Sequence, residues 1–451
     1  MRAFLHRERH GAADPKPTNR PLPAAWPRAA LALGVMCLGA CDENDVTGVG
    51  RELVAGGVVR TVEVVLDAQD FLLSDTTLGG FSALSAAATR LIALDTANAF
   101  QARAALQFAS APFAIDVPTD STTVVQDTLA VFVGARLQLV LDSLSRAPGD
   151  SARLVLEAIG EAWDPATATW DNSVDSAFVE SAWSVPGGGT PTPVDSAVWT
   201  AGGDTVSLFV DSATAHAWTD TDDPTRGALV RTLDEGARLE IVSAVLWLLA
   251  RPSVLPDTIL EVAIGTTGQI SLVDAPEAPP ELLLIGGAPA HRSFFRFAPG
   301  VDTLPVPCPD ASVECDLTVA DADLTFAGLE LTPVPLAGAP AILRSPTLTA
   351  RSVTPDPQFP LERAPLGASS GTTAVAADSL NGGVADSVIV MDVTRFLDEF
   401  LAGEDATPDR IAVASLAEGF RFGTVAVARA GSADGPRLRL ILTVASPQEI
   451  R

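Results

Sequence analysis

The stretch Glu161-Ala-Trp-Asp-Pro-Ala-Thr-Ala-Thr-Trp-Asp-Asn172 decides how the first half of this sequence folds. It follows residues 153–159, a run with the character of a β-strand. Because Pro165 has no N–H to donate to a sheet, the strand is expected to end near Trp163. The Asp and Thr side chains that follow can bond nearby backbone groups and hold a turn. The stretch therefore predicts a strand, a corner and a loop anchored by tryptophan.

Four tryptophans belong to this region: Trp163 and Trp170 in the corner, and Trp183 and Trp199 in the long loop of residues 175–203. An indole ring at the open end of an apolar core closes that core, with its N–H reaching a partner or water. The same rings could instead form a ligand platform for a sugar or a peptide. We favour core closure, and the platform alternative predicts that Trp183 or Trp199 is exposed beside a groove.

The composition restricts the class of protein. The 451 residues are enough for two or three domains, and 69 of them are Gly or Pro, which suits many short strands and turns. The net charge is −27, and removing residues 1–40, which carry a net +4, leaves −31. Since nucleic-acid binding depends on Lys and Arg neutralising phosphates, we predict no nucleic-acid partner. The acidic surface favours solubility and could attract divalent cations.

The N-terminus predicts export and a lipid anchor. A basic, Pro-rich segment precedes a short apolar run at residues 29–38, which has the length of a signal-peptide core. Leu38-Gly39-Ala40-Cys41 then resembles a bacterial lipobox, which implies that Cys41 becomes the lipid-bearing N-terminus, palmitate included. Residues 1–40 are accordingly predicted to be a lipoprotein signal peptide and residues 41–54 a tether. The alternative is an ordinary signal peptide or membrane anchor with an incidental cysteine.

Two further cysteines, Cys308 and Cys315, remain after Cys41 takes lipid and Cys37 leaves with the signal peptide. In an exported protein such a pair is expected to form a local disulfide. A zinc site is the alternative, but two cysteines without a nearby histidine are a poor ligand set.

The mature chain reads as an all-β protein. Short alternating runs recur at close spacing, and the helices that a parallel α/β fold needs between strands are missing from the pattern. We predict two tandem antiparallel β-sandwich domains of jelly-roll type, each with one short helix. The first is assigned to residues 55–274 and the second to residues 275–448, with the junction near the Pro-rich segment 275–280.

The second half repeats the order of the first. Five pairs of segments align: 103–108 with 292–297, 129–141 with 323–331, 204–218 with 386–401, 226–230 with 410–414, and 258–264 with 437–443. The third pair includes the predicted helices, residues 212–218 and 394–401. Five segments in one order indicate a duplicated domain.

These residues resemble the DNRLRE domain, a bacterial extracellular β-sandwich related to certain carbohydrate-binding modules. In the first copy the resemblance rests on segments 103–108, 135–139, 161–172 and 206–218, and in the second on segments 388–400 and 436–440. The second copy lacks tryptophan at the corner, where residues 351–357 stand. The resemblance implies cell-surface display, adhesion or glycan binding, often beside catalytic domains, and the sequence indicates no separate catalytic domain.

Candidates for chemistry are few. His216 and His291 occupy different motif positions in the two copies, and both are interpreted as surface or satisfied core residues. The carboxylates nearest the corner, Glu157, Glu161 and Asp164, could form a glycoside-cleaving pair, the least favoured alternative.

An acidic turn at residues 220–223 suggests calcium as a cofactor. Asp220, Asp222 and Asp223 place three carboxylates in one turn, and oxygen ligands suit calcium. The spacing is not that of an EF-hand, so a solvated acidic turn is the favoured interpretation.

Together these observations predict an exported, lipid-anchored protein of the cell envelope, on the outer membrane, the cell surface or the periplasmic face. Its role is expected to be non-catalytic: binding, adhesion or structure, with polysaccharide or another envelope protein as partner. A scaffold or assembly lipoprotein without a small ligand is the alternative, and it predicts that every tryptophan is buried.

Overall fold

The computed structural model describes most of residues 58–446. The described residues are 58–81, 89–119, 121–176, 178–308, 316–336, 342–354, 360–382, 387–403, 408–419 and 421–446. Residues Val59–Ser446 form one compact unit, which contains both sandwiches. The predicted all-β fold is confirmed, and each strand pair whose register is given runs antiparallel.

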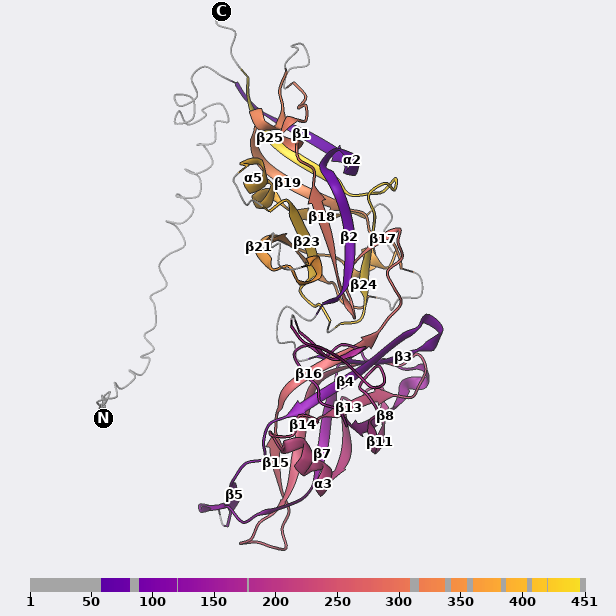
Figure 1. The fold of residues 1–451 in the computed structure, drawn as a ribbon, viewed down its shortest axis with the longest axis vertical. Helices are drawn as coiled ribbons and strands as arrows, with labels where there is room; N and C mark the ends of the chain where they lie inside the picture. Colours follow the sequence, from indigo (N-terminus) through magenta and orange to yellow (C-terminus); the bar gives the residue numbers. More distant parts are fainter. Residues whose placement is uncertain are drawn as a thin grey trace, which may run out of the picture. The chain divides into compact units, whose positions relative to one another are not determined.

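The first sandwich is built from one ten-stranded sheet that folds around its own core (Figure 1). Its strands are β3 (Arg90–Asp95), β4 (Phe100–Phe108), β7 (Val131–Leu141), β8 (Ser151–Ala158), β11 (Thr192–Thr200), β12 (Thr205–Asp211), β13 (Ala228–Thr232), β14 (Arg238–Arg251), β15 (Leu260–Ile264) and β16 (Thr266–Asp274). Strand β14 pairs with β3 through residues 238–241 and with β7 through residues 241–251, with a bulge between. One long strand therefore connects the two layers.

The second sandwich packs two separate sheets face to face. The smaller has the order β1 (Val58–Asp67), β25 (Arg437–Ser446), β19 (Asp323–Leu331) and β22 (Ile389–Asp392). The larger has the order β21 (Leu366–Ala374), β20 (Thr347–Val353), β23 (Arg410–Ser415), β18 (Ala290–Phe297), β17 (Leu282–Gly286) and β24 (Thr424–Ala428), with β2 (Leu72–Phe81) added on β18. Leu329 and Leu440 from the smaller sheet share a core with Phe295 and Ile411 from the larger.

Both predicted helices are confirmed, as α3 (Ser212–Thr219) and α5 (Thr394–Leu401). Each carries an aromatic side chain onto the strand that holds the first aligned segment of its copy, β4 or β18. Trp218 stacks on Phe108 with ring centroids 5.7 Å apart, and Phe400 lies 5.9 Å from Phe297. Two one-turn helices, α2 (Ala68–Phe71) and α4 (Ala377–Leu380), were not predicted.

Shorter elements complete the description. The hairpins are β5 (Ile115–Pro118) with β6 (Val124–Asp127), and β9 (Asn172–Asp175) with β10 (Glu180–Ala182). The 3-10 turns are η1 (Thr96–Asn98), η2 (Pro148–Asp150), η3 (Val301–Thr303), η4 (Val319–Asp321) and η5 (Leu361–Arg363).

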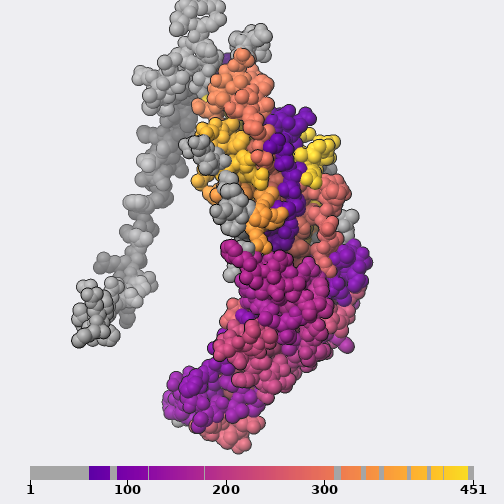
Figure 2. All heavy atoms as spheres, viewed as in Figure 1, coloured from indigo at the N-terminus to yellow at the C-terminus, as the bar shows by residue number. Residues whose placement is uncertain are grey.

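The structure corrects the predicted domain boundaries. Strands β1 and β2, assigned from sequence to the first domain, pair with β25 and β18 of the second sandwich. Indigo segments β1 and β2 accordingly lie among the orange and yellow strands in Figures 1 and 2. The first sandwich therefore spans β3 to β16 and is inserted between β2 and β17 of the second, so the two are not strictly in tandem. Alternation in a sequence fixes which face of a strand is buried, but it does not identify the sheet edge that the strand joins.

The strand pairing also shows how the two copies correspond. Strand β4 has neighbours β3, β13 and β16, and β18 has neighbours β17, β23 and β2, so β2 takes the place of β16. By the same comparison β1 takes the place of β15. The aligned segments 258–264 and 437–443 are therefore not equivalent, because β25 pairs with β19 as the second part of β14 pairs with β7. The other four aligned pairs lie in corresponding strands and helices.

Candidate functional site

The tryptophan corner is closed. Trp163 and Trp183 are 6% and 5% exposed and share a small core with Ile159, Leu229 and Leu272. The indole Nε1 of Trp163 donates to the carbonyl of Arg226 at 3.1 Å, and that of Trp183 to the carbonyl of Thr169 at 3.0 Å. With ring faces and N–H groups both used inside the protein, the corner closes a core as the favoured interpretation predicts.

The platform alternative is wrong for the loop tryptophans. Trp199 lies in strand β11 and not in the predicted loop; it is 3% exposed and donates from Nε1 to the Gly203 carbonyl at 2.7 Å. Trp170 is half-buried, and the guanidinium of Arg103 lies over its ring at 4.8 Å. Neither Trp183 nor Trp199 is exposed beside a groove. Both rings pack against apolar side chains of the first sandwich and are buried with them.

A triple-glycine segment seals the corner. The N–H of Gly187 donates to the Trp170 carbonyl at 2.6 Å, and its own carbonyl accepts from Arg103 Nη1 at 2.8 Å. Gly187 has φ +85°, and a Cβ there would lie 2.7 Å from the Trp170 ring. Only glycine combines this backbone conformation with so close an approach. The sequence marked this segment as a loop, but its docking depends on rings from another element.

Glu161 fastens the same loop. Its carboxylate accepts from the backbone N–H of Ser184 at 2.9 Å, from the Ser184 hydroxyl, and from the N–H of Thr190 at 3.1 Å. Hydrogen bonds from Ser184 hold the pKa of this carboxyl below its ordinary value. A carboxylate that accepts three bonds from its own protein is a loop anchor.

The other two carboxylates near the corner are also engaged in structure. Glu157 forms a bidentate pair with Arg231, with both N–O distances 2.9 Å. Asp164 accepts from the N–H of Ala166 and from the Thr167 hydroxyl, which is a turn-stabilising arrangement. These contacts favour a structural role for the three carboxylates over a glycoside-cleaving pair.

The acidic turn uses its carboxylates to hold its own backbone. Asp220 accepts from the N–H of Asp222 at 3.0 Å, and Asp223 accepts from the N–H and hydroxyl of Thr225. Within the described ranges, no group of three or more His, Cys, Asp or Glu is placed to share a metal ion. The geometry thus favours the solvated turn over a calcium site.

The histidines differ. His216 is exposed on α3, as a surface residue is expected to be. His291, at the start of β18, is 8% exposed, and its Nδ1 atom makes no hydrogen bond. Burial lowers the pKa of His291, and hydrogen bonds with the backbone of Gly286 and Pro289 act in the opposite direction. His291 is therefore a core residue, as predicted, with one ring nitrogen that lacks a hydrogen-bond partner.

A solvent-facing aromatic surface was missed by the sequence analysis. Trp247 in β14 is half-buried on the outer face of the sheet, and its Nε1 donates to Gln138 Oε1 at 2.8 Å. Arg136 lies 5.9 Å from its ring, and Phe209, directly opposite Arg136 in β12, is 64% exposed. The signal was present, since Trp247 alternates with the buried Leu246 and Leu248.

Several predicted features fall outside the described residues. These are the predicted signal peptide, Cys41, which is predicted to carry the lipid, and Cys315. Lipidation and the disulfide with Cys308 therefore stay predictions. Among the residues that are described, no helix has the length and apolar character needed to cross a membrane.

Comparison with known proteins adds no family. No family model matches the chain, and no curated protein matches it. A solved structure described as that of the Macrobrachium rosenbergii nodavirus aligns over 97% of this chain and 97% of its own, with 10% identity and a TM-score of 0.10. A TM-score that low supports no argument about fold or function.

Proposed function

We propose that this chain is a non-catalytic scaffold or display protein of the cell envelope, anchored by lipid at Cys41. The anchor rests on the lipobox-like residues, and the envelope role on the resemblance to DNRLRE domains. The tether of residues 41–54 leads into β1, which belongs to the second sandwich. The inserted first sandwich is then the part that is presented, at the end of the second.

The observation that carries this proposal is the way the two sandwiches are joined. The chain passes between them twice, from β2 to β3 and from β16 to β17. Two covalent connections restrict hinge motion more than one linker does, because rotation about one connection is opposed by the other. A presenting role benefits from such restriction, since an ordered spacer costs less entropy when a partner binds.

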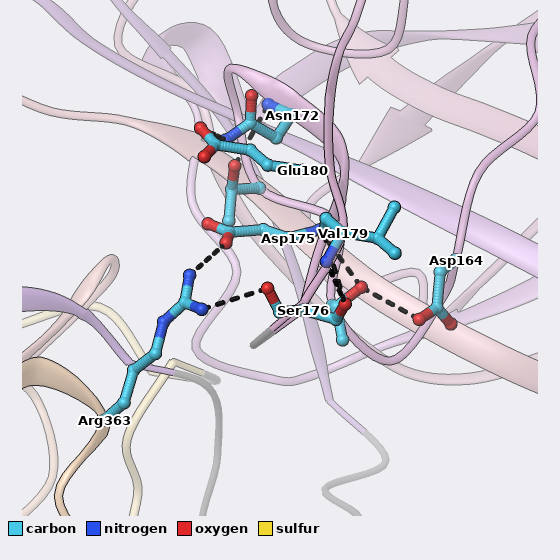
Figure 3. Close-up of polar contacts among 9 residues, drawn as sticks. Asp164, Asn172, Asp175, Ser176, Val179, Glu180 and Arg363 are labelled. Atoms are coloured by element: carbon cyan, nitrogen blue, oxygen red, sulfur yellow. Dashed lines mark hydrogen bonds and ion pairs between the residues drawn. The ribbon is translucent and has the colours of Figure 1, made fainter. Parts of the chain in front are cut away.

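Ion pairs between the sandwiches add to this restriction. Arg363 in η5 donates to the Asp175 carboxylate at 2.8 Å and to the Ser176 carbonyl at 2.9 Å (Figure 3). Arg344 pairs with Asp142 at 2.5 Å, and Arg421 pairs with Glu240. The Arg363 pair is partly exposed, and such a pair contributes only about 0–1 kcal/mol, so its effect is on orientation more than on stability. Arg344 and Arg421 instead reach carboxylates that are largely buried.

Two experiments test the proposal. Mass spectrometry of the protein made in a lipoprotein-processing bacterium is expected to find an acylated Cys41 and no residues 1–40. The Cys41→Ser control should leave the membrane fraction. An unmodified thiol at Cys41 in the mature protein would contradict the anchor.

The spacer is tested by distance measurements between spin labels at Ser196→Cys and Ser432→Cys, both exposed and one in each sandwich. A narrow distribution is expected, which broadens when Arg344, Arg363 and Arg421 are replaced together by alanine. A broad distribution in the unaltered protein would argue against an ordered spacer.

Polysaccharide binding is the second candidate, favoured by the outer face around Trp247 and Phe209. Aromatic rings with Arg, Gln and Glu side chains around them suit a sugar, which has apolar faces and a hydroxyl edge. A glycan array with residues 42–451 is expected to give hits that Trp247→Ala abolishes and Trp199→Phe retains. Hits that survive Trp247→Ala would exclude this face.

A further inference from the structure

Two aromatic rings lie in one row across the outer face of the first sandwich. Phe209 in β12 and Trp247 in β14 both stand opposite Arg136 of β7, which runs between these two strands. Neighbouring strands are about 4.7–4.9 Å apart, so residues with one strand between them lie about 9.5 Å apart across the sheet. The row therefore presents two rings to solvent at a separation that the sheet fixes.

Polar groups that suit sugar hydroxyls lie in the next row of the same face, where Gln138 stands opposite Ser207. The Gln138 side chain accepts from Trp247 Nε1 through its amide oxygen, which leaves its amide nitrogen as a donor. The Ser207 hydroxyl accepts from Arg136 Nη1 at 3.2 Å and keeps its own proton to donate. Apolar rings beside hydrogen-bonding groups match the two kinds of surface that a sugar presents.

The charged side chains of this face are engaged within the protein. Arg136 Nη2 lies 3.0 Å from each carboxylate oxygen of Glu261. Asp211, at the end of β12, accepts from the N–H and the hydroxyl of Thr214. A charged ligand would have to compete with these contacts and would lose hydration on binding, so an uncharged ligand fits better.

The corresponding strands of the second sandwich carry ion pairs at their outward positions. These strands are β25 and β1, which take the places of the second part of β14 and of β15. Arg439 lies 2.7 Å from Glu63, and Arg437 lies 3.5 Å from Asp67. The row of Phe209 and Trp247 is thus a feature of the first sandwich, the part that a display protein would present.

We propose that this face binds an extended, uncharged, β-1,4-linked polysaccharide that runs across the strands. In such a chain every second sugar turns the same face to the sheet, and this repeat matches two strand spacings. Alternate sugars stack on Trp247 and Phe209, and hydroxyls at the edge of the chain meet Gln138 and Ser207. The inference rests on the polysaccharide-binding candidate above and adds the linkage of the sugars and the direction of the chain.

The probes are cellotetraose, cellobiose and maltotetraose, titrated into residues 42–451 by calorimetry. Cellotetraose is expected to bind about tenfold more tightly than cellobiose, because it reaches both rings and cellobiose reaches one. Maltotetraose has the same sugars, but its α-1,4 links curve the chain, so it is expected to bind no more tightly than cellobiose. Equal affinities for the two tetrasaccharides, or for cellotetraose and cellobiose, would overturn the proposal.

Phe209→Ala tests the second ring, which is 64% exposed and can be removed without opening the core. The variant is expected to lower the affinity for cellotetraose to that for cellobiose and to leave cellobiose binding unchanged. Phe178→Ala, the same change at a ring that is 94% exposed between β9 and β10, is the control and should retain the tenfold difference. A tenfold difference that survives Phe209→Ala would contradict the two-ring arrangement.

Other results would separate this inference from the candidate on which it rests. Glycan-array hits with other linkages, abolished by Trp247→Ala, would refute the extended chain and retain the binding face. Binding of no glycan would refute both. Self-association that Phe209→Ala abolishes, without cellotetraose binding, would assign the face to a second copy of the chain instead. The lipid anchor at Cys41 is tested independently, and its failure would leave these titrations unchanged.

Discussion

Arg103 in β4 and Arg292 in β18 stand at aligned positions of the two copies, and they close their sandwiches differently. Each guanidinium lies over an aromatic ring, Arg103 over Trp170 at 4.8 Å and Arg292 over Phe81 at 4.0 Å. Arg103 donates to a backbone carbonyl, that of Gly187. Arg292 instead pairs through Nε and Nη2 with the carboxylate of Glu418, which is fully buried.

The difference follows from what covers each arginine. In the first copy a loop with half-buried Trp170 supplies a neutral acceptor. Burial lowers the pKa of Arg103, while the charges of Glu157 and Asp274, which make no hydrogen bond to it in the structure, raise it. In the second copy Phe81 comes from β2, a strand from the far end of the sequence, and the site is deeper. A buried guanidinium needs a counter-charge, because the cost of removing it from water exceeds what a neutral acceptor returns. The second closure is therefore the more fragile to a single substitution.

The largest effect is expected from removing β1 and β2, the two N-terminal strands that belong to the second sandwich. A chain of residues 89–451 lacks β1 and β2, and with them the core residues Leu66, Phe71 and Leu72. We expect the second sandwich to unfold and the first to persist. All tryptophans of residues 89–451 lie between residues 163 and 247, so their fluorescence reports on the first sandwich alone. Buried tryptophan emission, with loss of amide protection in residues 282–446, is the expected result.

The opposite outcome would restore the boundary predicted from sequence. If the shortened chain lost its buried tryptophan emission while β17 to β25 stayed protected, β1 and β2 would belong to the first sandwich. A chain of residues 42–451 is the control, and both regions should be protected in it.

The buried ion pair should give the next largest effect. Glu418→Ala leaves the Arg292 guanidinium buried without a counter-charge, and a loss of about 3–5 kcal/mol is expected. Arg103→Met, at the aligned position, should lose about 1–2 kcal/mol, the sum of a cation–π contact and a hydrogen bond. Urea unfolding measures both. Equal losses of stability would show that the buried ion pair of Arg292 contributes no more than the neutral hydrogen bond of Arg103.

Some of this comparison could be read from the sequence. Alternation identified most strands, and both helices were predicted at the end of one aligned pair of segments, 204–218 and 386–401. The corner was expected to be closed, and the indoles do close it. These features depend on neighbours close in the chain, which is the range over which periodicity and turn chemistry act.

The rest depends on partners distant in the sequence. The sequence could not predict that β1 and β2 join the second sandwich, because the edge of a strand offers the same hydrogen-bonding groups to any partner. The role of Gly187 depends on a ring that approaches from another loop. Likewise, the residues next to His291 in the sequence do not indicate that its Nδ1 atom has no partner, since this depends on all the side chains and backbone packed around the ring.

The glycine seal should give an intermediate effect. Gly187→Ala adds a Cβ at positive φ and within 2.7 Å of the Trp170 ring. Backbone strain and overpacking together are expected to cost about 2–4 kcal/mol. Gly202→Ala is the control, since φ there is +87° but no atom lies within 4 Å of the added Cβ. It should cost about 1 kcal/mol. Equal losses in thermal or urea unfolding would mean that the corner relaxes around the added atom.

The smallest effect is expected on the pH dependence of stability, through Glu161 at the tryptophan corner of the first sandwich. Because hydrogen bonds from Ser184 lower the pKa of Glu161 in the folded protein, the unfolded chain takes up the proton first as pH falls. The contribution of Glu161 is therefore complete well above its ordinary pKa of about 4.3, and it is lost as pH drops through the lower, folded value. Glu161→Gln should destabilise the protein clearly at pH 7 and little at about pH 3, as urea unfolding at both pH values would show. Glu399→Gln, in an exposed helical pair with Arg395, is the control and should change stability little at either pH. A Glu161→Gln loss that stays constant with pH would mean that the loop is held by the shape of the side chain and not by its charge.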